Sequence, residues 1–165
     1  MSETKPLIIK FKWDKETLIN SFDAIYEDEY KNSPRRLIGW ILIALSQYGV
    51  VAALKKNAFA ILIFSTIMLI YWYYGKKLIA KKRALKNFEN DPLKDKEIIV
   101  KASEKGLEID GKLWAWDKID AIDTLEKGFL VILGNKHYFI PTKGFQSFED
   151  ISRFKSFIKS TFPTS

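Results

Sequence analysis

Few of the side chains could perform chemistry, and they do not form a recognisable site. The chain has a single histidine, His137, and no cysteine, which excludes thiol catalysis, disulfides and cysteine-bound zinc. It has no glycine-rich phosphate loop, and no carboxylate pair with metal-binding spacing accompanies His137. The acidic cluster Glu27, Asp28 and Glu29 is typical of a solvated helix face, with a metal or partner site as the alternative. We therefore expect a protein that is not an enzyme and uses no cofactor or metal.

The basic and aromatic residues are more informative, because they indicate where the chain meets a membrane. The excess positive charge comes from residues 37–88, which hold eight Lys and Arg and no acid. Two runs in this segment, 37–54 and 58–74, lack any charged side chain. Each run is about the length that crosses a ~30 Å hydrocarbon layer as a helix. We predict a transmembrane hairpin; the alternative is two buried core helices, which usually carry one apolar stripe.

The residues that flank the two runs predict the orientation of the hairpin. Basic side chains gather before the first run and after the second, whereas the connection offers only Lys55 and Lys56. The positive-inside rule then places both termini in the cytoplasm, and aromatic residues at the end of the second run mark the headgroup level. The predicted interface and topology residues are Arg35, Arg36, Trp72, Tyr73, Lys76, Lys77, Lys81, Lys82 and Arg83.

Patterning divides the chain into three parts. The first is a cytoplasmic strand and amphipathic helix, the second is the hairpin with a basic exit helix, and the third is a small sheet domain. Asp14 is the predicted N-cap of the amino-terminal helix. The predicted bounds are 1–34 for the first part, 35–90 for the second, with spans at about 37–54 and 58–75, and 93–165 for the third.

The third part reads as short alternating strands separated by tight glycine turns, which predicts an antiparallel meander. Ser147 then opens a helix as its N-cap. A bent antiparallel sheet closed by one C-terminal helix is the pattern of a pleckstrin-homology-like (PH-like) barrel. The predicted fold class is therefore an α+β membrane protein, with a two-helix transmembrane hairpin and a cytoplasmic PH-like antiparallel β-barrel or sheet closed by a C-terminal helix.

Several short motifs carry a resemblance to a known family. They are Trp116-Asp117-Lys118-Ile119, the stretch from Tyr138 through Ile140-Pro141 to Phe145, and Phe148-Glu149-Asp150 followed by Phe154. With the two adjacent apolar runs and the basic exit, the sequence resembles the YcxB-like family of bacterial membrane proteins. The resemblance implies a PH-like C-terminal domain and a multi-pass location in the bacterial inner membrane. It brings no active site with it.

Four residues near these motifs are candidates for a partner surface: Trp114, Trp116, Asp117 and Phe145. A structural reading stands beside the functional one for each of them. The two tryptophans fall on one strand face and are expected to pack in the barrel, with a ligand platform as the alternative. Asp117 is expected to cap a turn, and Phe145 to plug the open end of the sheet.

The sequence therefore predicts a non-enzymatic inner-membrane protein with two spans. Its partners are the lipid bilayer and an unidentified protein or the membrane surface, bound through the PH-like domain. The basic cluster does not by itself favour nucleic acid, because such clusters beside a membrane helix usually reflect topology and attraction to anionic lipid. The alternative function is that of an immunity or inhibitor protein that neutralises a membrane-active or secreted toxin. The oligomeric state is left open.

Overall fold

A computed structural model describes residues 5–31, 33–56 and 59–162. The chain forms two compact units. The sheet unit combines Met1–Ile25 with Phe88–Ser165, and the helical unit is Tyr26–Asn87. This division differs from the predicted three parts. Strand β1 (Leu7–Lys12), which precedes the helical segment in the sequence, pairs with β2 (Glu97–Ser103), which follows it.

The sheet unit holds two antiparallel sheets. The first has the order β1-β2-β3-β4, and the second the order β5-β6-β7. In the first sheet the register sets Leu7 opposite Ala102 and Lys12 opposite Glu97. The remaining strands are β3 (Gly106–Ile109), β4 (Lys112–Ala115), β5 (Ala121–Leu125), β6 (Gly128–Leu133) and β7 (Lys136–Pro141).

The sheets do not close into a barrel, so the coarser prediction of an antiparallel α+β unit is confirmed and barrel closure is wrong. The two sheets adjoin at two junctions. At the junction between β4 and β5, a 3-10 turn, Trp116–Lys118, ends the first sheet before the second begins. At the other a 3-10 turn, Thr142–Gly144, lies against β1. Gly144 approaches so closely that a Cβ there would lie 3.0 Å from the Cγ2 atom of Ile9. Both gaps are thus occupied by short turns rather than by paired strands.

Helix α5 (Phe148–Thr161) completes the core of the sheet unit. Its predicted cap is confirmed, because the Ser147 hydroxyl accepts a hydrogen bond from the Asp150 N–H at 3.1 Å. Phe154 is fully buried, and its ring centroid lies 4.9 Å from that of Phe129. Burying these large apolar side chains between a helix and two sheets is the main stabilising term for a unit of this kind.

Helix α1 (Lys15–Lys31) begins in the sheet unit and ends in the helical unit. Asp14 caps it as predicted, accepting a hydrogen bond from the Thr17 N–H at 2.7 Å. In the sheet unit, Ala24 packs with Leu130 and Phe139 in a small second core. The residues of α1 from Tyr26 onward belong to the helical unit.

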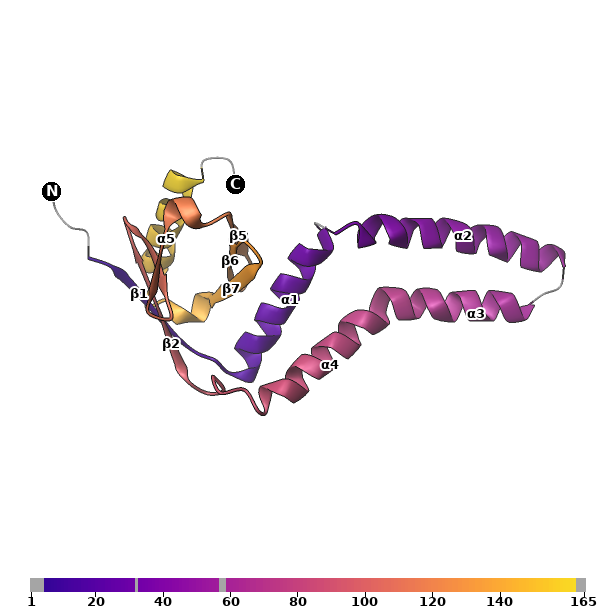
Figure 1. Cartoon of the computed structure of the whole chain (residues 1–165), viewed down its shortest axis with the longest axis horizontal. Coiled ribbons are helices and arrows are strands. Elements are labelled where there is room, and N and C mark those ends of the chain that lie inside the picture. Colours follow the sequence, from indigo (N-terminus) through magenta and orange to yellow (C-terminus); the bar gives the residue numbers. More distant parts are fainter. Residues whose placement is uncertain (1–4, 32, 57–58, 163–165) are drawn as a thin grey trace. The chain divides into compact units, whose positions relative to one another are not determined.

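The helical unit contains α2 (Arg35–Lys55), α3 (Phe59–Ile70), a π-helical turn (Tyr71–Gly75) and α4 (Lys76–Phe88). α2 and α3 contact each other and run side by side (Figure 1). Within the described residues one helix, α2 over Leu37–Lys55, is long and apolar enough to cross a membrane, and 6% of that stretch is buried. In the second predicted span the α-helical part, α3, is only 12 residues long, and the helix continues directly into the π turn.

Candidate functional site

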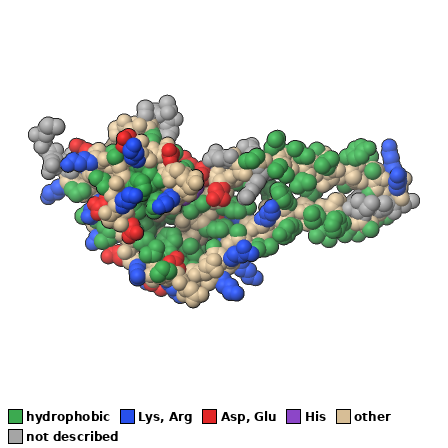
Figure 2. All heavy atoms as spheres, in the orientation of Figure 1, with side chains coloured by type: hydrophobic (Ala, Val, Ile, Leu, Met, Phe, Trp, Pro, Cys, Tyr) green, Lys and Arg blue, Asp and Glu red, His purple; other side chains and the backbone are tan. Residues whose placement is uncertain are grey.

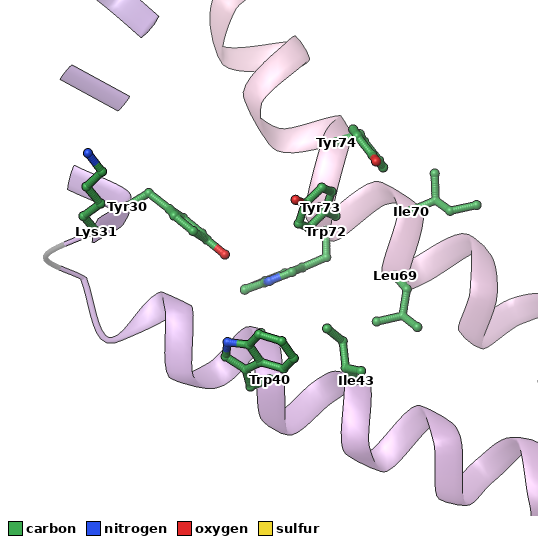
Figure 3. Close-up of a pocket in the computed structure, with 10 residues that line it drawn as sticks. Tyr30, Lys31, Trp40, Ile43, Leu69, Ile70, Trp72, Tyr73 and Tyr74 are labelled. Carbon is green, nitrogen blue, oxygen red and sulfur yellow. The ribbon is translucent and has the colours of Figure 1, made fainter. Parts of the chain in front are cut away.

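A hollow in the helical unit is lined mainly by aromatic residues (Figure 3). It consists of two adjoining cavities of about 630 and 520 Å³, which share Tyr30, Lys31, Trp72, Tyr73 and Tyr74 and which together we call the aromatic pocket. The larger cavity is also lined by Gly39, Trp40, Ile43, Leu69 and Ile70, and the smaller by Tyr26, Glu27, Lys77 and Leu78. Volumes of roughly 300–1,000 Å³ are typical of small-molecule sites.

The π turn positions the aromatic side chains of the second helical run. A π turn adds a residue to the helical repeat, so that side chains beyond it leave the stripe that an α-helix would give them. Figure 3 shows Tyr30, Trp40 and Trp72 directed toward one another from α1, α2 and the π turn. Gly75 ends the turn, where a Cβ would approach the Cδ2 atom of Tyr71 to 2.8 Å. The sequence thus folds locally so that three helical segments contribute aromatic rings to one place.

Basic side chains lie beside these rings. The Lys76 ammonium is 3.6 Å from the centroid of the Trp72 ring, a cation–π contact. The Lys77 ammonium lies 5.7 Å from the Tyr26 ring centroid and 3.8 Å from the Glu27 carboxylate. Further along α4, Lys82 and Arg83 are exposed and Lys81 is half-buried. The pocket therefore has aromatic walls and a cationic margin.

The structure brings together part of the predicted interface set. Trp72, Tyr73 and Lys77 line the aromatic pocket, and Lys76 lies over Trp72. Arg35 and Arg36 begin α2, but their side chains lie outside the described part of the chain.

Sequence reasoning missed Tyr30 and Trp40 as members of the same site, whereas Tyr74 belongs to the aromatic end of the second run that was predicted to mark the headgroup level. A signal was present, because the start of one helix and the end of the next lie at the same level in a helical hairpin. Trp40 stands near the start of the first apolar run and Trp72 near the end of the second. Tyr30 carries no such signal, since it lies in the preceding amphipathic helix.

Two of the four candidate partner residues are core residues of the sheet unit. Trp116 is 9% exposed, and its indole N–H donates a hydrogen bond to the Ser103 carbonyl at 2.9 Å. Phe145 packs with ring centroids 5.7 Å from Phe129 and 5.5 Å from Phe154. The expected role of Phe145 in filling the end of the sheet thus agrees with its contacts; Trp116 is buried, and Phe145 is half-buried against the core.

The other two candidates reach the surface. Trp114 is half-buried in β4, with the Lys112 ammonium 4.1 Å from its ring centroid. Asp117 is exposed in the 3-10 turn. β4 ends at Ala115, so Trp116 lies in the 3-10 turn that follows, but both tryptophans pack with the core of the sheet unit as expected. The four residues therefore do not make one surface.

A cluster of ionised groups joins the two chain segments that build the sheet unit. The Lys143 ammonium lies 2.9 Å from the Asp14 carboxylate and 3.0 Å from that of Glu16, and we call this group the Asp14 clip. Burial opposes ionisation of Asp14, but hydrogen bonds from the Thr17 N–H and from Lys143 outweigh it and lower the pKa of Asp14 to about 2. Burial likewise opposes the charge of Lys143, but its bonds to the two carboxylates raise its pKa above the ordinary value.

No metal centre is evident in the part of the chain that the structure describes. There, no three His, Asp or Glu side chains converge as ligands of a metal ion would.

Comparison with known proteins locates a family within the sheet unit. No curated protein and no solved structure is significantly similar to the chain. The matched segment runs from β4 through the second sheet into α5 and includes Trp116, Asp117 and Phe145. The resemblance drawn from the sequence is confirmed there, because residues 113–158 match the family model of the YcxB-like proteins.

Proposed function

We propose that the chain is a non-enzymatic protein of the bacterial inner membrane, with two spans and both termini in the cytoplasm. In this proposal the helical unit is the anchor, and the sheet unit is a PH-like module that binds a protein partner at the membrane surface. Anchoring raises the effective concentration of the module for any partner in the same membrane.

The observation that carries the proposal is the pairing of β1 with β2. Residues 7–12 and 97–102 are antiparallel neighbours in one sheet, so they must lie on the same side of any membrane. The chain between them therefore crosses the membrane an even number of times. If α2 crosses once, a second crossing must bring the chain back, and the segment of α3 with the π turn is the apolar stretch available for it.

The dimensions and surface of this second segment support a crossing. Residues 59–75 are helical without a break, at 1.5 Å per residue about 25 Å, and α4 continues the run. Apolar side chains cover α2 and α3 on the face shown in Figure 2. Large apolar residues exposed on both helices include Trp40, Leu45, Tyr48, Ile63, Phe64 and Ile67. A soluble core helix would bury one face, whereas side chains exposed around a helix fit a surface in contact with lipid.

The architecture of the sheet unit supports the PH-like assignment. A four-stranded antiparallel sheet, a three-stranded one and a terminal helix that packs on the core are consistent with the sheet and closing helix expected of such a module. The helical unit is inserted between the first and second strands.

Single-cysteine labelling tests the topology directly, because the natural chain has no cysteine. A membrane-impermeant maleimide added to spheroplasts should label a Lys56→Cys variant at once. It should label a Glu126→Cys variant only after permeabilisation, and both positions are exposed. The chain should also remain in the membrane pellet after carbonate extraction. Labelling of both variants in intact spheroplasts, or release by carbonate, would contradict the proposal.

The outer face of the first sheet is our candidate for binding the protein partner. It exposes Ile8, Ile99 and Leu113 around the Lys101–Glu108 ion pair. Ile8→Lys and Leu113→Lys variants should lose partners that cross-link to the natural chain in membranes. Removing residues 93–165 is a poor control, because it would leave β1 without its paired strand. A matched charge placed at Phe148, which is 80% exposed on α5, should leave cross-linking unchanged.

A further inference from the structure

We propose that the aromatic pocket binds one anionic phospholipid from the surrounding bilayer. An acyl chain occupies the larger cavity, and the phosphate lies against the lysines of the smaller one. The inference rests on the proposed membrane location of the helical unit and adds to it a specific lipid site.

The two cavities differ in the charged residues that line them, because Glu27 and Lys77 line only the smaller cavity whereas Lys31 lines both. The larger cavity runs between α2 and α3, where Ile43 and Leu69 point toward one another (Figure 3). The smaller cavity opens onto Lys31 and Lys77. The aromatic residues common to both cavities stand at the boundary, which is where Trp and Tyr side chains prefer to lie in a membrane protein.

The charge at the polar end favours an anionic headgroup. Lys31, Lys76 and Lys77 lie in or beside the pocket, and Glu27 is the acid that lines it. Three cations and one anion leave a net charge of +2 at the margin. Glu27 offsets Lys77 only in part, since the two groups are 3.8 Å apart and the Glu27 side chain is 59% exposed. Basic pockets between helices on the cytoplasmic side of a membrane are known to hold anionic headgroups.

A glycine provides room for the acyl chain. A Cβ at Gly39 would lie 3.5 Å from the Trp72 Nε1 atom, so a larger side chain there would extend into the cavity. Gly49 lies on the same helix, and a Cβ there would meet nothing within 4 Å. A leucine at position 39 therefore fills the site, and a leucine at position 49 is its matched control.

The test uses the full chain in nanodiscs that contain equal amounts of phosphatidylglycerol and phosphatidylcholine, with retained lipid counted by native mass spectrometry. We expect one phosphatidylglycerol to be retained in preference to phosphatidylcholine. Each lysine near an anionic headgroup contributes roughly a fivefold effect, so Lys31→Gln with Lys77→Gln should lower phosphatidylglycerol retention at least tenfold. Lys55→Gln with Lys56→Gln, at the other end of the hairpin, should not change it.

Two further variants separate the lipid site from a loss of folding. Gly39→Leu should abolish retention while Gly49→Leu keeps it. Glu27→Gln should raise retention by up to about fivefold, a gain that misfolding could not produce. Equal retention of both lipids in every variant, equal loss in both glycine variants, or a mass of two chains without lipid would overturn the inference. A chain released by carbonate overturns the membrane proposal itself, whereas an embedded chain without lipid preference overturns only the lipid site.

Discussion

The Asp14 clip yields a quantitative prediction about the stability of the sheet unit. Asp14 has two functions that two substitutions can separate. Its carboxylate caps α1 through Thr17, and it pairs with Lys143, which lies 129 residues further along the chain. Asp14→Asn keeps an oxygen for the cap and removes the charge, because asparagine caps helices about as well as aspartate. Asp14→Ala removes both.

The size of each effect follows from the geometry. A pKa lowered from 3.8 to about 2 corresponds to at most about 2.5 kcal/mol, at 1.36 kcal/mol per pKa unit. The Asp14 side chain is 33% exposed, so solvent screening reduces the ionic contribution, and we expect Asp14→Asn to cost about 1 kcal/mol. Losing the cap as well adds about 1 kcal/mol, so Asp14→Ala should cost about 2 kcal/mol.

The dependence on pH has a definite sign. The folded pKa of Asp14 lies below its unfolded value, so the charge stabilises the fold at all pH values above about 5. That stabilisation is lost as the pH falls from about 4 through about 2. The difference between the natural chain and Asp14→Asn should therefore be constant from pH 5 to 7 and shrink steadily below pH 4.

Urea titration with pulse proteolysis of the full chain in mild detergent measures these differences at each pH. Lys143→Met is the reciprocal variant and should lose about as much stability at pH 7 as Asp14→Asn. The reasoning fails if Asp14→Asn costs nothing at pH 7, or if its cost is the same at pH 7 and pH 3.

Three further predictions concern the core of the sheet unit, each measured by the urea midpoint of the full chain. Phe154→Ala should cost about 4 kcal/mol, because it empties a fully buried site between two aromatic rings; a cost below 2 kcal/mol would contradict the packing. Gly106→Ala should cost about 2–3 kcal/mol, since φ is +151° and a Cβ would lie 2.1 Å from the Trp114 carbonyl oxygen, whereas Gly111→Ala, with open space around it, should cost less. Trp116→Phe should cost about 1–2 kcal/mol through loss of the bond to the Ser103 carbonyl, and an unchanged midpoint would exclude that bond as a stabilising contact.

Local pattern predicted the elements of the sheet unit well. Alternation and glycine turns predicted the short antiparallel strands, and the capping residues Asp14 and Ser147 were correct because a cap depends only on its own helix. The strand predicted to include Trp116 ends one residue earlier, because its indole turns inward to reach Ser103. Tertiary packing thus determines where this strand ends, and the alternation of apolar and polar residues alone does not predict it.

Two features of the structure depend on contacts that local sequence patterns do not predict. The pairing of Leu7 with Ala102 joins segments separated in the sequence by the whole helical unit. The pattern of each segment predicts a strand but does not indicate which strand it pairs with. The π turn at Tyr71–Gly75 breaks the 3.6-residue period on which helix prediction depends. The aromatic pocket itself was therefore not predicted, although some of the residues that line it were predicted as membrane-interface residues.

Hydrogen bonds of Trp13 join the chain that precedes the helical unit to the chain that follows it. Trp13 donates its backbone N–H to the Lys96 carbonyl at 2.9 Å, accepts a bond from the Asp95 N–H at 2.9 Å and donates its indole N–H to Asp91 at 3.1 Å. These bonds hold the departing and returning chain together directly below the first strand pair. Closing a loop of some eighty flexible residues would cost entropy that grows with its length. A helical hairpin shortens the effective loop, because its two ends already emerge side by side. Because β2 follows the helical unit in the sequence, β1 can pair with it only when the helical unit lets the chain return to β1.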